Sequence, residues 1–167
     1  MRFKIILRYF FLILAIATMV YVFFMSSQTA AVSTKSSGRV IETIAKILIK
    51  DFESSSPENK IEIIRMYQGI VRKTAHFAIF ACLGFWVGGY LLTYTMPTQK
   101  LKTIYSILFC LVYAVSDEIH QLFVAGRSCQ LSDIIIDLFG ALFGILIINL
   151  LYFLFKKFFF ARKVANQ

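Results

Sequence analysis

The chain has 167 residues, which suits one compact domain; 59% of them are apolar and only 16% are charged. Soluble domains average about 45–50% apolar and about 25% charged residues, so a soluble protein of this composition would expose large apolar patches. The composition excludes a soluble enzyme, a disordered tail and a disulfide scaffold. The formal net charge of +9 does not indicate nucleic-acid binding, because the basic residues are not clustered on one soluble face. The remaining class is an all-α integral membrane protein.

Four segments are apolar over the length of about 20 residues that a helix needs to span a bilayer. They are Ile5–Met25, Thr74–Tyr94, Thr103–Val124 and Ile134–Phe155. The first follows basic residues, as in a signal peptide, but its apolar stretch is longer than the about 7–15 residues of a secretory h-region. We therefore predict an uncleaved first helix and one domain, 1–167, built as a bundle of four transmembrane helices.

The distribution of charge predicts the orientation, because Lys and Arg accumulate in short cytoplasmic loops. With the N-terminus inside, the cytoplasmic side carries nine of the 18 basic residues and none of the nine acidic ones. This side includes the basic tail, 156–167, so both termini are predicted to be cytoplasmic. The whole net charge then faces the anionic inner leaflet, and the basic patches act as topology determinants.

The segment Gln28–Lys73 is too polar to span a membrane. Apolar residues recur at helical spacing in two stretches, and Ser56 followed by Pro57 is typical of a helix start. We predict two short amphipathic helices on the extracytoplasmic surface. A lid over a site and a packing cover are both compatible with this pattern.

Polar and ionisable residues gather at one level of the predicted bundle. An ionisable side chain within a membrane helix costs about 2.5–3.5 kcal/mol on insertion scales and by default marks a site. In the predicted topology they all lie in the outer half, at the ends of several helices: Arg72, Lys73, His76, Asp117, Glu118, His120, Gln121, Arg127, Asp133 and Asp137.

Helical spacing predicts where two of these carboxylates point. At about 100° per residue, Asp133 and Asp137 share a face with Gly140 and Gly144. Because a small-xxx-small face lets helices approach closely, both carboxylates should point into the bundle. Gly84 and Gly88 offer a similar surface on the second span.

The residue types suggest three roles for the cluster. Asp117 beside His120 is a candidate carboxylate–imidazole pair for proton transfer, with His76 and Glu118 as further catalytic candidates. The second role is binding of an anionic or lipid head group, by Arg72, Lys73, Arg127 and Gln121. Asp133 and Asp137 would orient these groups or, with Glu118 or His120, hold a divalent cation; no zinc-ligand spacing supports that cofactor.

Two structural interpretations stand beside these roles. Arg72 or Arg127 could pair with Asp133 or Asp137 only to hold helix ends together. The three cysteines do not form a disulfide framework: Cys82 and Cys110 lie within helices as small apolar residues, and Cys129 lies alone in an outer loop.

An ordered set of short motifs resembles the VanZ-like family of small bacterial membrane proteins. The matching pieces are Ser26-Ser27-Gln28, Arg72-Lys73-Thr74-Ala75-His76-Phe77, Asp117-Glu118-Ile119-His120-Gln121, Gly126-Arg127 and Asp133-Ile134-Ile135-Ile136-Asp137-Leu138-Phe139-Gly140. The resemblance implies a multi-pass protein of the bacterial cell membrane. It also implies a link to resistance against lipoglycopeptide antibiotics such as teicoplanin.

The residues favour a protein that binds a phosphorylated or amphiphilic lipid head group at the outer leaflet. Chemical modification of that head group by the same residues is an extension of this hypothesis. The partners of the protein would be membrane lipids or a lipid-linked substrate, not nucleic acid. Two alternatives remain, a non-catalytic accessory subunit and a small transporter. A transporter would need polar residues through the inner half of the helices, where only Ser106 and Asn149 occur.

Overall fold

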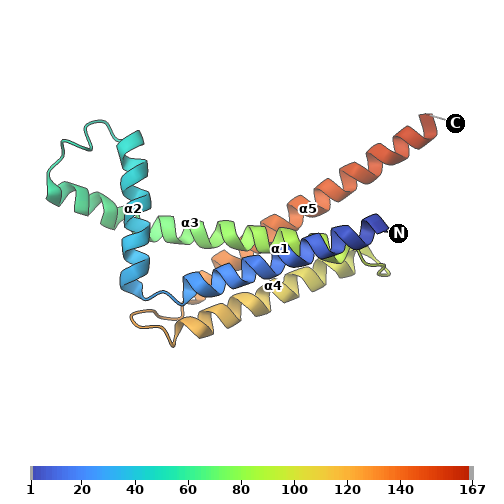
Figure 1. The fold of residues 1–167 in the computed structure, drawn as a ribbon, viewed down its shortest axis with the longest axis horizontal. Coiled ribbons are helices and arrows are strands. Elements are labelled where there is room, and N and C mark those ends of the chain that lie inside the picture. Colours follow the sequence, from blue (N-terminus) through green and yellow to red (C-terminus); the bar gives the residue numbers. More distant parts are fainter. Residues whose placement is uncertain (1, 166–167) are drawn as a thin grey trace.

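The computed structural model describes the backbone of residues 2–165 and the side chains of residues 2–158. Its helices follow one another without any strand in this part of the chain, so the protein is all-α (Figure 1). Their bounds are α1 (Arg2–Ser26), α2 (Ala30–Leu48), α3 (Pro57–Leu92), α4 (Gln99–Gln121) and α5 (Leu131–Ala165).

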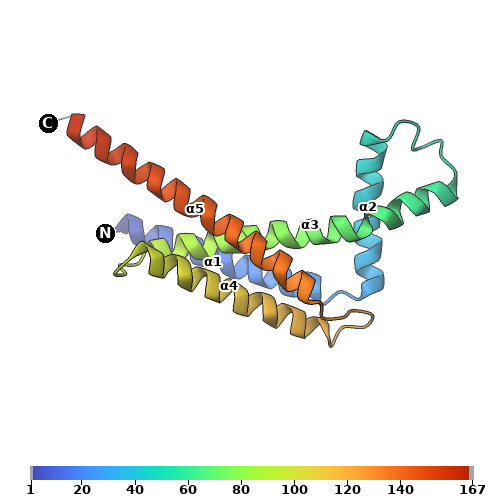
Figure 2. The same ribbon diagram turned by 180° about the vertical axis from the view of Figure 1, so that it is seen from behind.

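Four of the helices alternate in direction along one long axis, and α2 crosses that axis at one end (Figures 1 and 2). The beginning of α1 and the end of α5 lie at the same end of the molecule. The opposite end, which we name the α2 end, holds the end of α1, the whole of α2 and the loop between α4 and α5. The predicted polar residues are placed at this α2 end.

Three helices in the described part of the chain are long and apolar enough to cross a membrane: α1, α3 and α5 as far as Phe158. The predicted fourth span is α4, which is a 23-residue helix but does not reach the same apolarity. Lys100 and Lys102 at its start, and Asp117, Glu118 and His120 near its end, lower its hydropathy. The length and composition of the helices, together with the bundle they form, are those of a membrane protein.

The segment predicted to hold two separate surface helices is arranged differently in the structure. Its first helix is α2, but its second amphipathic stretch and the predicted second span form one continuous helix, α3. Ser56 caps α3 as predicted, its Oγ accepting a hydrogen bond from the Asn59 amide at 3.3 Å, and Pro57 follows at the first helical position. The pattern changes from amphipathic to apolar along α3, but no residue there breaks the helix.

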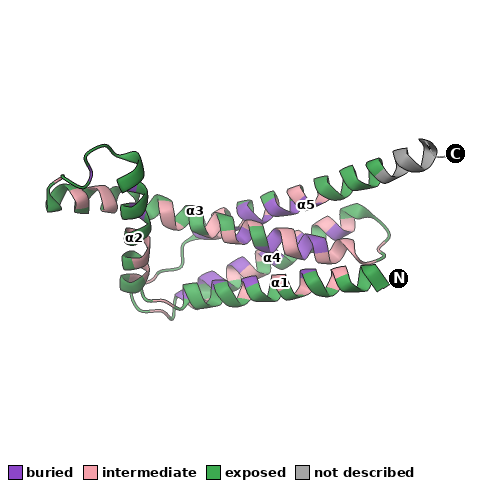
Figure 3. Cartoon of the chain, turned by 45° about the horizontal axis from the view of Figure 1, so that its top comes forward, coloured by how far each residue is buried: buried purple, intermediate pink, exposed green. Residues whose placement is uncertain are grey.

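Close packing of α3 against α5 forms the centre of the bundle, where the buried residues concentrate (Figure 3). A Cβ added at Gly140 would overlap the backbone carbonyl of Phe77, and one added at Gly144 would overlap that of Ala81. Gly84 is likewise placed against the carbonyl of Ala141. The predicted small-residue faces therefore do bring two backbones together, and this contact lies one turn from Asp137.

Candidate functional site

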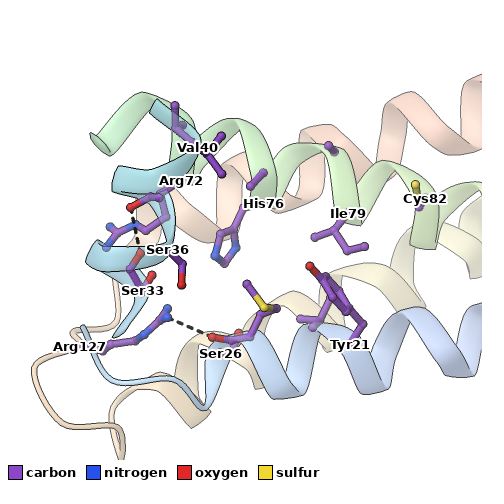
Figure 4. A pocket seen from close by; sticks show the side chains of 16 residues that line it. Tyr21, Ser26, Ser33, Ser36, Val40, Arg72, His76, Ile79, Cys82 and Arg127 are labelled. Atoms are coloured by element: carbon purple, nitrogen blue, oxygen red, sulfur yellow. Dashed lines mark hydrogen bonds between the residues drawn. The ribbon is translucent and has the colours of Figure 1, made fainter. Parts of the chain in front are cut away.

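A cavity of about 420 Å³ opens at the α2 end, between the end of α1, the start of α2 and the middle of α3 (Figure 4). Pockets for small ligands span about 300–1,000 Å³, so this one is large enough to hold part of an amphiphile. Its lining residues are Tyr21, Val22, Met25, Ser26, Ser33, Ser36, Ser37, Val40, Val71, Arg72, Ala75, His76, Ala78, Ile79, Cys82 and Arg127.

The two ends of the cavity differ in polarity. Arg72, Arg127, Ser33 and Ser36 gather where α2 crosses the bundle, with His76 beside them, and form the polar end (Figure 4). Further along α1 and α3 the lining becomes apolar, and Tyr21, Ile79 and Cys82 form the apolar end. Tyr21 and Cys82 are both exposed on the surface of the bundle. The cavity therefore runs from a cationic, hydroxyl-rich end to an apolar end that opens sideways.

An imidazole–carboxylate pair lies at the polar end of the cavity. Nδ1 of His76 on α3 is 3.3 Å from Oδ1 of Asp137 on α5. The Asp137 side chain is fully buried, and its other oxygen, Oδ2, has no hydrogen-bond partner among the described residues. His76 itself is accessible enough to line the cavity. The pair thus joins a cavity-facing imidazole to a carboxylate shielded from solvent.

Asp117 is held by a chain of hydrogen bonds that crosses three segments. Its Oδ2 accepts from the Ser26 hydroxyl of α1 at 2.9 Å and from the Gln121 amide at 3.1 Å. The Gln121 Oε1 in turn accepts from Nη1 of Arg127 at 3.2 Å. Both bonds to Asp117 fall on the same oxygen, and all four side chains are at least partly buried. Gln121 therefore bridges Asp117 to Arg127.

Arg127 fastens the loop between α4 and α5 to the end of α1. Its Nε donates to the Gln28 carbonyl at 2.9 Å and its Nη2 to the Met25 carbonyl at 3.1 Å. Gly126, at a φ of 75°, makes the turn that presents Arg127. Partial burial, reinforced by the charge of Arg72, lowers the pKa of the Arg127 guanidinium, although arginine stays protonated in proteins. This side chain satisfies carbonyls at a helix end and still borders the cavity.

Two further acids lie outside the cavity lining. Glu118 is fully buried, and its Oε2 accepts a hydrogen bond from the backbone N–H of Gln130 at 2.9 Å, while Oε1 has no partner among the described residues. Asp133 is mostly buried and lies 3.7 Å from Nη2 of Arg72 in an ion pair. Glu118 therefore holds the loop before α5, and the Arg72–Asp133 pair matches the predicted bracing between helix ends.

Three features of the predicted site are arranged differently in the structure. His120 makes no hydrogen bond to Asp117; its Nε2 lies 3.1 Å from the Ser27 hydroxyl, and its ring stacks on Phe23 at 4.7 Å. The two residues share a face of α4, but each side chain contacts a different residue of α1 instead of the other. Asp117 accepts a hydrogen bond from Ser26, and the His120 ring packs on Phe23. Lys73 is exposed and does not line the cavity, but it borders a separate small hollow that Arg72, His76 and Asp133 also line.

The third difference concerns the candidate cation ligands. The predicted set was Asp133 and Asp137 with Glu118 or His120. The structure instead brings together His76, Asp117 and Asp137, each of which offers one ligand atom within 4.8 Å of the other two. Spacing along one helix predicts which residues share a face, but not which neighbouring helix that face meets. The three residues come from α3, α4 and α5.

The serines of α2 were absent from the predicted site. Ser33, Ser36 and Ser37 all line the cavity. Their spacing of three and four residues places them on one face of the helix, which is a signal that the sequence contains. Ser37 is engaged with backbone carbonyls and with Gln68, whereas the side-chain hydroxyls of Ser33 and Ser36 have no partner in the described part of the chain.

The family model described as VanZ/LLP1 matches residues 11–154, a range that contains every residue of the site. No curated protein and no solved structure matches the chain. The match extends from α1 into α5 and therefore covers most of the bundle.

Proposed function

Because the chain belongs to the VanZ/LLP1 family, and because its cavity is amphiphilic, we propose that this membrane protein binds an amphiphile with an anionic head group at the extracytoplasmic leaflet. The observation that carries the proposal is the cavity of about 420 Å³ that has Arg72 and Arg127 at one end and Tyr21 and Cys82 at the other. The head group would occupy the polar end, and the first part of an acyl chain would follow the apolar end.

The polar end supports recognition of an anion such as a phosphate. The Arg72 side chain is 41% exposed and its ion pair with Asp133 spans 3.7 Å, which is longer than a good hydrogen bond. Its guanidinium therefore keeps donors for a ligand, and planar guanidinium groups suit phosphate oxygens well. The hydroxyls of Ser33 and Ser36 add further donors at the same end.

The apolar end supports the binding of a lipid chain from the side. Ala75, Ala78 and Cys82 follow one another along α3 at helical spacing and are all exposed. Their small side chains leave a shallow track between α3 and the exposed ring of Tyr21 on α1. An acyl chain in this track would stay in contact with the surrounding bilayer, so the ligand would not have to leave the membrane.

The proposed topology is four crossings with both termini in the cytoplasm. It treats α4 as a fourth span, which is supported by its alignment with the neighbouring helices (Figure 2). It also agrees with the excess of Lys and Arg at the end of the bundle opposite α2. This orientation places the cavity, α2 and the start of α3 on the extracytoplasmic side.

A transporter is less well supported than a binding protein. Ser106 donates its hydroxyl to the Lys102 carbonyl, and Asn149 donates to the Ile145 carbonyl. The Ser106 bond stays within α4, and Asn149 also accepts a hydrogen bond from the Gln99 side chain at the start of α4, at 2.7 Å. That contact lies at the end of the bundle opposite α2, so neither residue is bonded to the polar cluster. An accessory subunit that uses the cavity to present a lipid to a partner protein remains the second candidate.

Cysteine protection tests the proposal, because one of the two exposed thiols lines the cavity and the other lies outside it. Cys82 lines the cavity, whereas Cys129 lies exposed in the loop after α4. The full chain in detergent would be treated with N-ethylmaleimide, and the modification of each cysteine followed by mass spectrometry. Dihexanoyl phosphatidic acid should slow the modification of Cys82 and leave that of Cys129 unchanged.

The control ligand is dihexanoylglycerol, which has the same chains without the phosphate. Weaker protection by this compound at equal concentration would support recognition of the anionic head group. Equal protection by both compounds would contradict that part of the proposal, and no protection of Cys82 by either would overturn it.

Resistance to lipoglycopeptides such as teicoplanin is part of the same proposal, as a cellular consequence of binding an envelope amphiphile. A bacterium that expresses the chain should tolerate more teicoplanin than one that expresses Arg127→Ala or Asp117→Asn at equal membrane abundance. Equal tolerance of well-folded variants and the unaltered chain would remove antibiotic resistance from the proposal.

A further inference from the structure

We propose that His76, Asp117 and Asp137 form a binding site for one divalent transition-metal cation. One ring nitrogen of His76 and one carboxylate oxygen from each aspartate already lie within 4.8 Å of one another. Imidazole and carboxylate groups are common ligands of such cations. This inference is independent of the proposed lipid ligand.

One oxygen of the Asp137 carboxylate points to a missing ligand, because only the other oxygen has a partner, Nδ1 of His76 at 3.3 Å. The Asp137 side chain is fully buried, and Oδ2 has no hydrogen-bond partner in the described part of the chain. Buried polar atoms are nearly always partnered, and burying a charged group without full compensation costs more than burying a neutral one. A cation between Asp137 and Asp117 would supply the partner that is lacking.

The balance of charge supports the same conclusion. Asp117 and Asp137 are both buried, and in the part of the chain that the structure describes neither is within ion-pair distance of a Lys or Arg side chain. Arg127 reaches Asp117 only through Gln121. Two carboxylates at membrane depth are costly, and one divalent cation would neutralise both while His76 stays uncharged.

The ligand types favour a cation such as Zn²⁺ or Mn²⁺ over Ca²⁺ or Mg²⁺. Calcium takes six to eight oxygen ligands, and magnesium usually keeps several waters and binds few protein carboxylates, whereas imidazole suits first-row transition metals. Both hydrogen bonds to Asp117 use Oδ2, so its other oxygen is available. Three protein ligands leave a coordination position open, and His76 and Ser26 connect the site to the cavity.

Cobalt titration tests the proposal directly. The full chain would be purified without a histidine tag, in a maltoside detergent free of phospholipid, stripped with EDTA, and titrated with Co²⁺ at neutral pH. We expect visible absorption bands that saturate at one Co²⁺ per chain and are lost on adding Zn²⁺. His76→Gln or Asp137→Asn should weaken binding by more than about tenfold, because the loss of even a group that only orients a metal ligand typically costs about 10–100-fold.

Two matched variants serve as controls. His120→Ala removes the only other histidine of the chain, and Asp133→Asn removes an acid that pairs with Arg72 outside the three ligands. His120→Ala should leave the affinity for Co²⁺ unchanged, and Asp133→Asn should lower it less than either ligand variant does. In His120→Ala loaded with Cu²⁺, pulsed EPR should still detect one coordinated imidazole, that of His76. This measurement does not depend on whether the ligand variants fold.

Absence of saturable Co²⁺ binding to the wild-type chain would overturn the proposal and would indicate that protons neutralise the buried carboxylates. Loss of the imidazole signal in His120→Ala would also overturn it. Binding of Co²⁺ without protection of Cys82 by phosphatidic acid would support the metal site and contradict the proposed function. Protection of Cys82 without binding of Co²⁺ would support the proposed function and contradict the metal site.

Discussion

His76 on α3 and Asp137 on α5 are joined across the bundle by a contact of 3.3 Å between Nδ1 and Oδ1, beside the point where Gly140 packs against the backbone of Phe77. The position of the imidazole therefore depends on how closely two helix backbones approach. A side chain at any of the packed glycines would separate α3 from α5 and would move His76 relative to the carboxylate. The chemistry of the site and the stability of the bundle are thus linked through the same helix pair.

Gly144→Ala should destabilise the bundle by about 1–3 kcal/mol, the usual cost of overpacking, because the new methyl group would overlap the Ala81 carbonyl. The free energy of unfolding in mixed detergent micelles measures this change. Gly69→Ala on the same helix as Ala81 is the control, because nothing lies within 4 Å of the added carbon. That control should be stabilising by about 0.5–1 kcal/mol, since alanine favours helices more than glycine does. Equal effects of the two substitutions would contradict the close packing.

Ser26→Ala should lower the free energy of unfolding by about 1.5–3 kcal/mol, because it removes a 2.9 Å hydrogen bond to the buried carboxylate of Asp117. Ser116→Ala is a suitable comparison, since the exposed Ser116 hydroxyl bonds only to the Tyr113 carbonyl in its own helix. Its effect should stay within about 0.5 kcal/mol. The same unfolding measurement applies, and a Ser26→Ala variant as stable as the wild type would show that this bond is not formed.

Arg127→Lys should fail to restore the stability that Arg127→Ala loses. The guanidinium donates to three separate acceptors, on Met25, Gln28 and Gln121, and a single ammonium group cannot reach that arrangement. Thermal unfolding of the three proteins in one detergent measures the difference. Lys73→Ala is the control, because Lys73 is exposed and outside the cavity, and it should unfold at the wild-type temperature. Full recovery by lysine would mean that the charge alone matters.

Several parts of this architecture could be predicted from sequence because they depend on local patterns. The apolar spans, the cap at Ser56 and the glycine faces each follow from spacing within one helix. The pairing of His76 with Asp137 could not be predicted, because it depends on the rotation and depth of α3 relative to α5. For the same reason His120, which is placed correctly at the end of α4, was assigned the wrong partner. The continuity of α3 was missed because a change in hydropathy resembles a boundary between helices.

The proposed orientation predicts that Cys129 reacts with a membrane-impermeant thiol reagent on intact cells. Cys129 is exposed in the loop after α4, which would face the extracytoplasmic side. Cys110 is buried and serves as an internal control that should stay unlabelled before and after lysis. Labelling of Cys129 only after lysis would reverse the orientation and would move the cavity to the cytoplasmic side.

The most direct measurement is native mass spectrometry of the full chain after incubation with dihexanoyl phosphatidic acid. The wild type should retain one molecule of this lipid. Ala78→Phe, which places a ring in the cavity, should retain none, whereas Val112→Phe, at an exposed position of α4 outside the cavity lining, should retain one. Equal retention by all three proteins would show that the lipid does not occupy this cavity, and the proposed function would then be wrong.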